Sequence, residues 1–306
     1  MKRLAPQTAA LLVTLTTAVA CQAVDTSVSA GAFHTCAVNA AGSIQCWGDD
    51  RNGQVSGAPS GSGYSAVSAG NAHTCAINDS GSIQCWGSDD YGQVSTAPSG
   101  SDYISVSAGA FHTCAINPMG SIQCWGYDGL VAGQVSKTPT DSGYTSVSAG
   151  WNHNCAINAL GGIQCWGDNM FGQVSDAPGF GQVSVAPTGG GYISVSGGAG
   201  HTCAINAAGS IECWGGGYDP YGLISATPTG SGCSSVNAGD YHTCAINAAG
   251  SIQCWGYDYD GVISDAPTGS GYSAVSAGAD HNCAINAAGS IQCWGLDEYG
   301  QVSDAP

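Results

Sequence analysis

From residue 26 onward, short apolar stretches alternate with polar turn residues, and the i, i+3, i+4 spacing of an amphipathic helix is absent. A representative unit consists of Ser27–Gly31, His34–Asn39, Gly42–Gly48 and Gly53–Ser56, followed by Ala58-Pro59. Each of these four stretches is β-rich and is bounded by Gly, Asn or Pro turn residues. The pattern therefore predicts four short antiparallel strands in each unit.

The unit recurs seven times, and one histidine in each copy marks the period. The spacings between these histidines are 39, 39, 41, 48, 41 and 39 residues, and the repeats begin near residues 26, 65, 104, 145, 193, 234 and 273. Four strands in about 40 residues is typical of a propeller blade. We therefore predict an all-β, seven-bladed β-propeller that forms a single domain over residues 21–306.

The recurring motifs are Ala-Gly-x-x-His-Thr-x-Ala-[Ile/Val], Gly-Ser-Ile-x-x-Trp-Gly and Gly-Gln-Val. Over residues 26–306 they resemble the repeat of the regulator of chromosome condensation family. The resemblance implies a seven-bladed propeller. It specifies the scaffold more than the activity, because that family includes a nuclear nucleotide-exchange factor, a plant ultraviolet photoreceptor and a secreted bacterial β-lactamase inhibitor.

Fourteen of the sixteen cysteines form seven pairs, each ten residues apart. In the first pair, a three-residue loop ending in Gly42 joins two strands, and a left-handed glycine there favours a tight hairpin. That register places Val38 opposite Ile44 and Cys36 opposite Cys46, at a separation that a disulfide can bridge. We predict one disulfide in each blade: Cys36–Cys46, Cys75–Cys85, Cys114–Cys124, Cys155–Cys165, Cys203–Cys213, Cys244–Cys254 and Cys283–Cys293.

Metal binding is the alternative use of these cysteines. The spacing Cys-x9-Cys is not the Cys-x2-Cys of a zinc knuckle, so we predict no metal site at the cysteines and no cofactor. Calcium remains a weaker alternative, because Asp49-Asp50 and Asp258-Tyr259-Asp260 offer oxygen ligands without a complete loop motif.

Residues 1–20 have the pattern of an export signal. Lys2 and Arg3 precede an apolar stretch that ends in Ala18-Val19-Ala20. Cys21 follows directly, as in a bacterial lipoprotein, so a lipid anchor on Cys21 and plain secretion are the two alternatives. Either route places a bacterial protein in the cell envelope or outside the cell, where disulfides form. Cys233 stands where other repeats have Tyr, and it is either a free thiol or the partner of Cys21.

The chain is strongly acidic. Its formal net charge is −17, and removal of Lys2 and Arg3 takes it to −19, with only Arg51 and Lys137 left as basic residues. Such a charge repels nucleic acids and anionic membranes, so a membrane contact is expected only through lipid on Cys21. The charge and the export signal also argue against nucleotide exchange on a nuclear GTPase, and they favour a basic partner.

The histidines and tryptophans recur once in each unit, which favours a structural role. We expect each His ring to hydrogen-bond backbone at a strand start and each Trp to pack between blades. Catalysis needs dissimilar groups that converge at one place, and no nucleophile–base pair or carboxylate pair stands out from the repeats. We therefore predict that the protein is not an enzyme. The histidines are His34, His73, His112, His153, His201, His242 and His281.

Function is expected in the two loops that differ between otherwise similar copies, one before each His and one after each Trp-Gly. Their Asp residues are best explained as Asx-type turns, whereas their aromatic residues suit an interaction surface. We predict a monomeric, non-enzymatic binding module for an extracellular protein or glycan. The alternatives are an enzyme inhibitor, as in the similar secreted inhibitor, and a propeller hydrolase or lyase. The candidate binding residues are Phe33, Tyr91, Phe111, Trp151, Phe171, Tyr221, Tyr241, Tyr257, Tyr259 and Tyr299.

Overall fold

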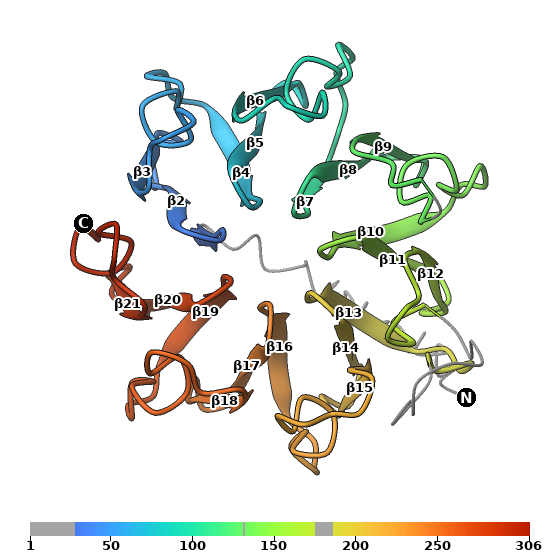
Figure 1. The fold of residues 1–306 in the computed structure, drawn as a ribbon, viewed down its shortest axis with the longest axis vertical. Helices are drawn as coiled ribbons and strands as arrows, with labels where there is room; N and C mark the ends of the chain where they lie inside the picture. The colour runs from blue at the N-terminus through green and yellow to red at the C-terminus, as the bar shows by residue number, and fades with distance from the viewer. Residues whose placement is uncertain (1–27, 131, 175–185) are drawn as a thin grey trace, which may run out of the picture.

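A computed structural model describes residues 28–130, 132–174 and 186–306, and these form seven small sheets arranged in a ring (Figure 1). The first blade lies beside the last, so the chain ends next to the blade with which the ring begins (Figure 1). The expected signal peptide and Cys21 lie outside the described residues. In the described part of the chain, no helix is long and apolar enough to cross a membrane.

Each blade is an antiparallel sheet in which the three strands are hydrogen-bonded in chain order. We number the blades 1 to 7 along the chain. Their strands are β1 (Val28–Ala30), β2 (His34–Val38) and β3 (Ile44–Gly48); β4 (Tyr64–Ala69), β5 (His73–Asn78) and β6 (Ile83–Gly87); β7 (Ser105–Ala108), β8 (His112–Ile116) and β9 (Ile122–Gly126); β10 (Tyr144–Ala149), β11 (His153–Asn158) and β12 (Ile163–Gly167); β13 (Tyr192–Gly197), β14 (His201–Asn206) and β15 (Ile211–Gly215); β16 (Cys233–Ala238), β17 (His242–Asn247) and β18 (Ile252–Gly256); and β19 (Tyr272–Ala277), β20 (His281–Asn286) and β21 (Ile291–Gly295).

The prediction of a fourth strand in each blade is wrong. The fourth segment of blade 1, around Gln54 and Val55, forms turns instead. The Asp50 carboxylate accepts hydrogen bonds from the amides of Val55 and Ser56, at 2.9 and 2.8 Å, so these amides cannot join a strand ladder. The carbonyl of Gln54 is also engaged, because it accepts the indole hydrogen bond of Trp86 in the next blade.

The predicted hairpin register and the disulfides are confirmed. Cys36 is opposite Cys46 and Val38 is opposite Ile44, while Gly42 has a φ of 74° at the loop. All seven expected cystines are present, and the first has a Cα–Cα separation of 4.1 Å. Each blade is therefore covalently closed within one hairpin.

The hydrophobic core lies between the blades rather than within them. Seven clusters occupy the seven junctions, and each combines a cystine of one blade with a Trp of the next. Between blades 5 and 6, for example, Cys203, Ile205 and Val236 pack with Trp255. The indole N–H groups donate to the fourth segment of the preceding blade, as Trp47 does to the Gln301 carbonyl at 3.0 Å. The tryptophans therefore hold neighbouring blades together.

The innermost strands approach each other so closely that only glycine fits at their ends. A Cβ on Gly109 would collide with the carbonyl oxygen of Gly150 and with the ring of His112. Gly278 of blade 7 has the same relation to the carbonyl of Gly31 in blade 1. The glycine at the end of each inner strand thus allows the seven blades to close into one ring.

Candidate binding face

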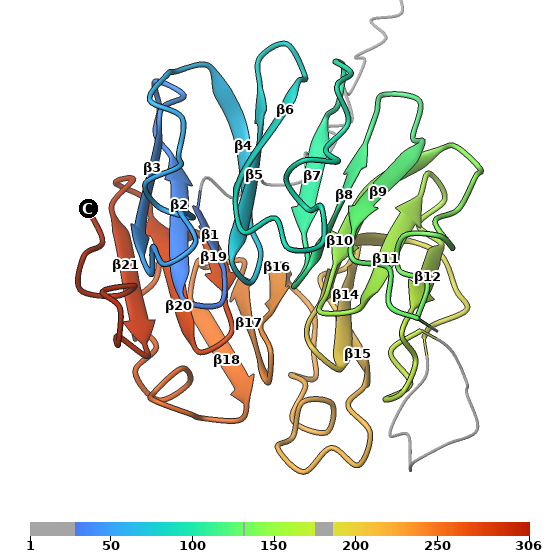
Figure 2. The same ribbon diagram turned by 45° about the horizontal axis from the view of Figure 1, so that its top comes forward.

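Two kinds of loop from each blade lie together on one side of the ring, which we call the loop face. The turn between the first and second strands ends there, and so does the third strand. In blade 1 the amide of Asp49, just after β3, donates to the carbonyl of Phe33, just before β2, at 2.8 Å. The other six blades have the equivalent bond, so the two variable loops of the sequence form one surface. Figure 2 shows the loops after β15 and β18 on the same side of the ring.

The loops after the third strands are held by Asp side chains within them, or by Asn169 in blade 4. Asp89 accepts hydrogen bonds from the amides of Val94 and Ser95, at 2.8 and 2.9 Å. The Ser95 amide contributes most to holding the pKa of Asp89 below its usual value. Equivalent caps are Asp50, Asp128, Asn169, Asp219, Asp258 and Asp297. These Asp residues therefore shape turns, and the loop face is a fixed surface.

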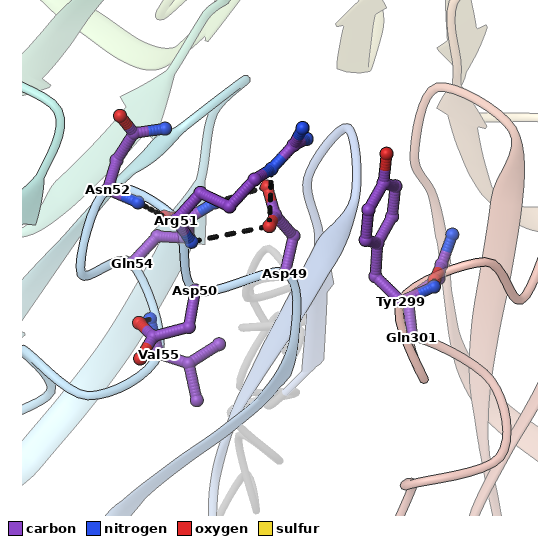
Figure 3. Close-up of polar contacts among 8 residues, drawn as sticks. All are labelled: Asp49, Asp50, Arg51, Asn52, Gln54, Val55, Tyr299 and Gln301. Carbon is purple, nitrogen blue, oxygen red and sulfur yellow. Dashed lines mark hydrogen bonds and ion pairs between the residues drawn. The ribbon is translucent and has the colours of Figure 1, made fainter.

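The junction between blades 7 and 1 contains an internal cation–aromatic contact (Figure 3). Arg51 Nε donates to Asp49 Oδ1 at 2.8 Å, and the guanidinium carbon lies 4.7 Å from the ring centre of Tyr299. The Asp49 side chain is buried and also accepts from Gln54 Nε2 at 3.0 Å. Tyr299 in turn packs edge-on against Phe33, with ring centres 5.5 Å apart. The hydrogen bond with Asp49 is the main reason that the pKa of Arg51 is raised.

At the junction between blades 2 and 3, the positions of Tyr299, Phe33 and Asp49 are all occupied by aromatic residues. Tyr91 packs against Phe111 at 5.5 Å and against Tyr127 at 4.8 Å between ring centres. Tyr91 is half exposed, whereas Phe111 and Tyr127 are partly buried beneath it. Tyr127 was not among the predicted binding residues, although its position directly after Trp-Gly is the position of Tyr257, which was.

The junction between blades 5 and 6 has the largest group of exposed rings. Tyr221 of blade 5 lies 4.3 Å from Tyr257 and 6.4 Å from Tyr241 of blade 6, measured between ring centres. Tyr259 stacks on Tyr257 at 6.0 Å, with 14° between the ring planes. All four side chains are between 41% and 48% exposed. We call these four residues the tyrosine surface.

Trp151 and Phe171, the remaining predicted binding residues, do not join an aromatic cluster in the described structure. Phe171 lies against Gly200 and Gly217 at the junction of blades 4 and 5. Trp151 lines a cavity of about 400 Å³ on the ring axis, which the inner strands surround with Ser, Ala and Gly residues. The sequence motif aligns Trp151 with Ala32, Asn71 and Ala110 of other blades, and these residues line the same cavity.

Two carboxylates, Asp240 and Asp280, also line this axial cavity. Burial and the nearby Asp280 raise the pKa of Asp240 to about 7. Burial and Asp260 raise the pKa of Asp280 as well. Burial raises the pKa of Tyr241, and the negative charges of Asp240 and Asp280 raise it further. The tyrosine surface therefore lies beside two carboxylates that line the axial cavity.

The seven histidines form a buried ring that links each blade to the next. His34 Nε2 lies 2.8 Å from Thr74 Oγ1, and His242 Nε2 lies 2.7 Å from Asn282 Oδ1. The sequence predicts a backbone partner for each ring, whereas the partner of Nε2 is a Thr or Asn side chain on the neighbouring blade. Burial lowers the pKa of every one of these histidines, to about 3 or 4.

The residues weighed for calcium have other partners or lie apart. Asp50 and Asp258 cap turns, and Asp49 binds Arg51 and Gln54. Within the described ranges, no three His, Cys, Asp or Glu side chains gather in a way that could hold a metal ion. Cys233 is partly buried and has no disulfide among the described residues, and its alternative partner Cys21 lies outside them.

Comparison with known sequences agrees with this architecture. The description "Regulator of chromosome condensation (RCC1) repeat" matches six stretches, residues 26–54, 64–93, 103–130, 144–173, 233–262 and 272–301. They cover more than half of the chain, and the repeat they omit is blade 5, which has the extra Gly216-Gly217 before Tyr218. No curated protein matches the chain significantly.

Solved structures share the propeller. The ectodomain of the Physcomitrella patens receptor kinase CR4 is 26% identical, with a TM-score of 0.70 over 88% of this chain and 73% of that chain. The ectodomain of the Arabidopsis thaliana receptor kinase ACR4 is 24% identical, with a TM-score of 0.69 over 90% and 98%. The BP39L lectin from Burkholderia pseudomallei, at 13% identity and a TM-score of 0.54 over 90% and 97%, shares the fold alone. With seven copies of the motif, a closed ring of seven blades and six matching repeats, the chain belongs to the regulator of chromosome condensation (RCC1) repeat family.

Proposed function

We propose that this protein is an extracellular, non-enzymatic binding module whose loop face recognises a protein or a glycan. The observation that carries the proposal is the grouping of exposed aromatic side chains at blade junctions around the axial cavity. Aromatic anchors of this kind dominate the binding energy of many interfaces. Propeller loops held by capping carboxylates provide such anchors at a low entropic cost, because the surface is ordered before the partner arrives.

Location outside the cytoplasm is supported by the seven cystines, since such bonds persist in oxidising compartments. The similar CR4 chain is itself a receptor ectodomain. An export signal at residues 1–20, with or without lipid on Cys21, accounts for this location. Mass spectrometry of the mature N-terminus tests it, because a chain that begins at Met1 would contradict export.

The binding proposal is tested with the intact propeller and a variant in which Trp151, Tyr241 and Tyr257 are changed to Ala. Both are immobilised and exposed to a glycan array and to culture medium of the source organism. We expect a partner that the intact protein retains and the variant loses, while circular dichroism and melting temperature stay unchanged. A control variant, Met119→Ala, removes an exposed apolar side chain from a β8–β9 hairpin turn on the opposite side of the ring and should bind normally.

Equal capture by the intact protein and the triple variant would refute the loop face as the binding surface. Turnover of a glycan or peptide by the intact protein would contradict the non-enzymatic assignment.

A further inference from the structure

The guanidinium of Arg51 is bound within the protein by side chains of two neighbouring blades. It lies over Tyr299, which packs on Phe33, and its charge is satisfied by Asp49. Its side chain is 63% exposed, so the contact forms at the surface without a closed pocket. A guanidinium over an aromatic ring is a favourable electrostatic contact, and Arg makes it more often than Lys. The junction between blades 7 and 1 therefore shows that aromatic residues at a blade junction can bind a guanidinium group.

The tyrosine surface is the equivalent junction of blades 5 and 6, with tyrosines in place of both Asp49 and Arg51. Its Tyr221, Tyr241 and Tyr257 occupy the positions of Tyr299, Phe33 and Asp49, and Tyr259 occupies the position of Arg51. From residue 138 to the end, the chain contains neither Lys nor Arg, so its own loops cannot supply a cation there. The four rings contact one another, edge-on, tilted or stacked, and remain 41–48% exposed.

The charge around the tyrosine surface favours a positive occupant. Asp240 and Asp280 lie beside Tyr241 and line the adjoining axial cavity, while Asp260 follows Tyr259 directly. Burial and the neighbouring carboxylates raise the pKa values of Asp240 and Asp280, and a cation beside them would relieve the repulsion between these carboxylates. The chain as a whole has a net charge of −17, which attracts a basic partner and repels an acidic one.

We propose that the tyrosine surface, flanked by Asp240 and Asp280, binds arginine side chains of a basic protein segment through its ring faces, in the way that the Tyr299 ring contacts Arg51. This inference rests on the proposed binding function and specifies its partner. The guanidinium stacks on the exposed tyrosine faces and the neighbouring carboxylates compensate its charge. The aromatic cluster of blades 2 and 3 offers a second, smaller platform for the same segment.

The test uses the full-length mature protein and synthetic peptides in isothermal titration calorimetry. One peptide is a flexible Gly-Ser chain with three spaced arginines, and its control has citrulline, the neutral isostere, at the same positions. We expect the arginine peptide to bind at least tenfold more tightly than the citrulline peptide and to weaken as salt is added. Because both peptides have the same shape, the difference isolates the charge.

Variants then locate the contact. Tyr241→Leu and Tyr257→Leu remove the ring face but keep an apolar side chain, and each should weaken the arginine peptide by about three- to thirtyfold. Tyr241→Phe and Tyr257→Phe keep the ring and should bind normally, which shows that folding is intact. Met119→Ala in the β8–β9 hairpin should also leave binding unchanged.

Equal affinity for the arginine and citrulline peptides would overturn the inference, and so would unchanged affinity in both Leu variants. If the array instead finds a neutral glycan whose binding is lost in Tyr257→Leu, the loop face remains a binding surface but the basic-partner inference fails. If neither peptides nor array ligands depend on the loop face, the proposed function fails as well.

Discussion

Thr35 in blade 1 and His281 in blade 7 meet across the point where the ring closes, with Thr35 Oγ1 2.7 Å from His281 Nε2. A contact from His Nε2 to a Thr or Asn side chain joins each of the other six pairs of neighbouring blades, as between His34 and Thr74. Among the described residues, each blade is built from three strands that follow one another in the chain, so the contact between blades 7 and 1 is a side-chain junction and not a shared sheet. The junction of blades 7 and 1 has the same kind of core as the others, with Cys283 of blade 7 packed near Trp47 of blade 1.

Loss of the Thr35 hydroxyl should weaken the junction between blades 7 and 1 and so lower the stability of the fold. Thr35→Val leaves the buried His281 nitrogen without a partner, and we expect the free energy of unfolding to fall by about 1–3 kcal/mol. Urea denaturation followed by Trp fluorescence measures this loss. Thr35→Ser keeps the hydroxyl and should recover most of it, whereas equal losses in Val and Ser variants would mean that only the methyl group matters.

One glycine of the inner circle should be intolerant of any side chain. Gly109→Ala places a Cβ against the Gly150 carbonyl and the His112 ring, so two blades must move apart. We expect a loss of about 1–3 kcal/mol from overpacking. Gly61→Ala is the control, because a Cβ there meets nothing within 4 Å. Equal melting temperatures for the two variants would contradict the close approach of the inner strands.

Removal of a single cystine should weaken the fold without abolishing it. Replacing Cys75 and Cys85 together by Ala releases a ten-residue link, and the chain-entropy relation gives a loss of roughly 2–3 kcal/mol. The loss should be seen in urea denaturation under non-reducing conditions. Cys233→Ala removes a thiol that has no disulfide in the described structure and should cost much less. Peptide mapping that finds cystines between blades would disprove this scheme.

Stability should fall as the pH is lowered from 6.5 towards 5. Burial lowers the pKa of all seven ring histidines to about 3 or 4. In this pH range the histidines of the unfolded chain therefore bind protons, whereas those of the folded protein do not. Charged neighbours also repel, and His112 and His34 lower the pKa of His73 further. Most carboxylates titrate below this range.

Asp240 opposes this trend, since its raised pKa makes the folded state bind a proton that the unfolded state releases. The histidines outnumber it, and Asp240→Asn should therefore steepen the loss of melting temperature between pH 6.5 and 5. Differential scanning calorimetry across this range checks the sign. A melting temperature that rises on acidification would refute the neutral, buried state of the histidine ring.

The sequence by itself determined the repeat, the number of blades and the cystines, because all three depend on local spacing. A hairpin loop ending in Gly42 fixes which residues face each other, so the pairing of Cys36 with Cys46 could be read from the chain alone. The structural role of Trp and His followed from their recurrence, but the partners did not. Trp86 bonds the Gln54 carbonyl and His34 bonds Thr74 across a junction that no single repeat contains.

Tertiary structure decided what the fourth segment does and which aromatic residues meet. Val55 lies in a β-like stretch, yet its amide donates to the Asp50 carboxylate, and the neighbouring Gln54 carbonyl accepts from Trp86 of the next blade. Tyr221 and Tyr257 are 36 residues apart in the sequence, and only the packing of blade 5 on blade 6 places their ring centres 4.3 Å apart. Local spacing sets the blade, whereas the surface forms between blades, from side chains that the closed ring brings into contact.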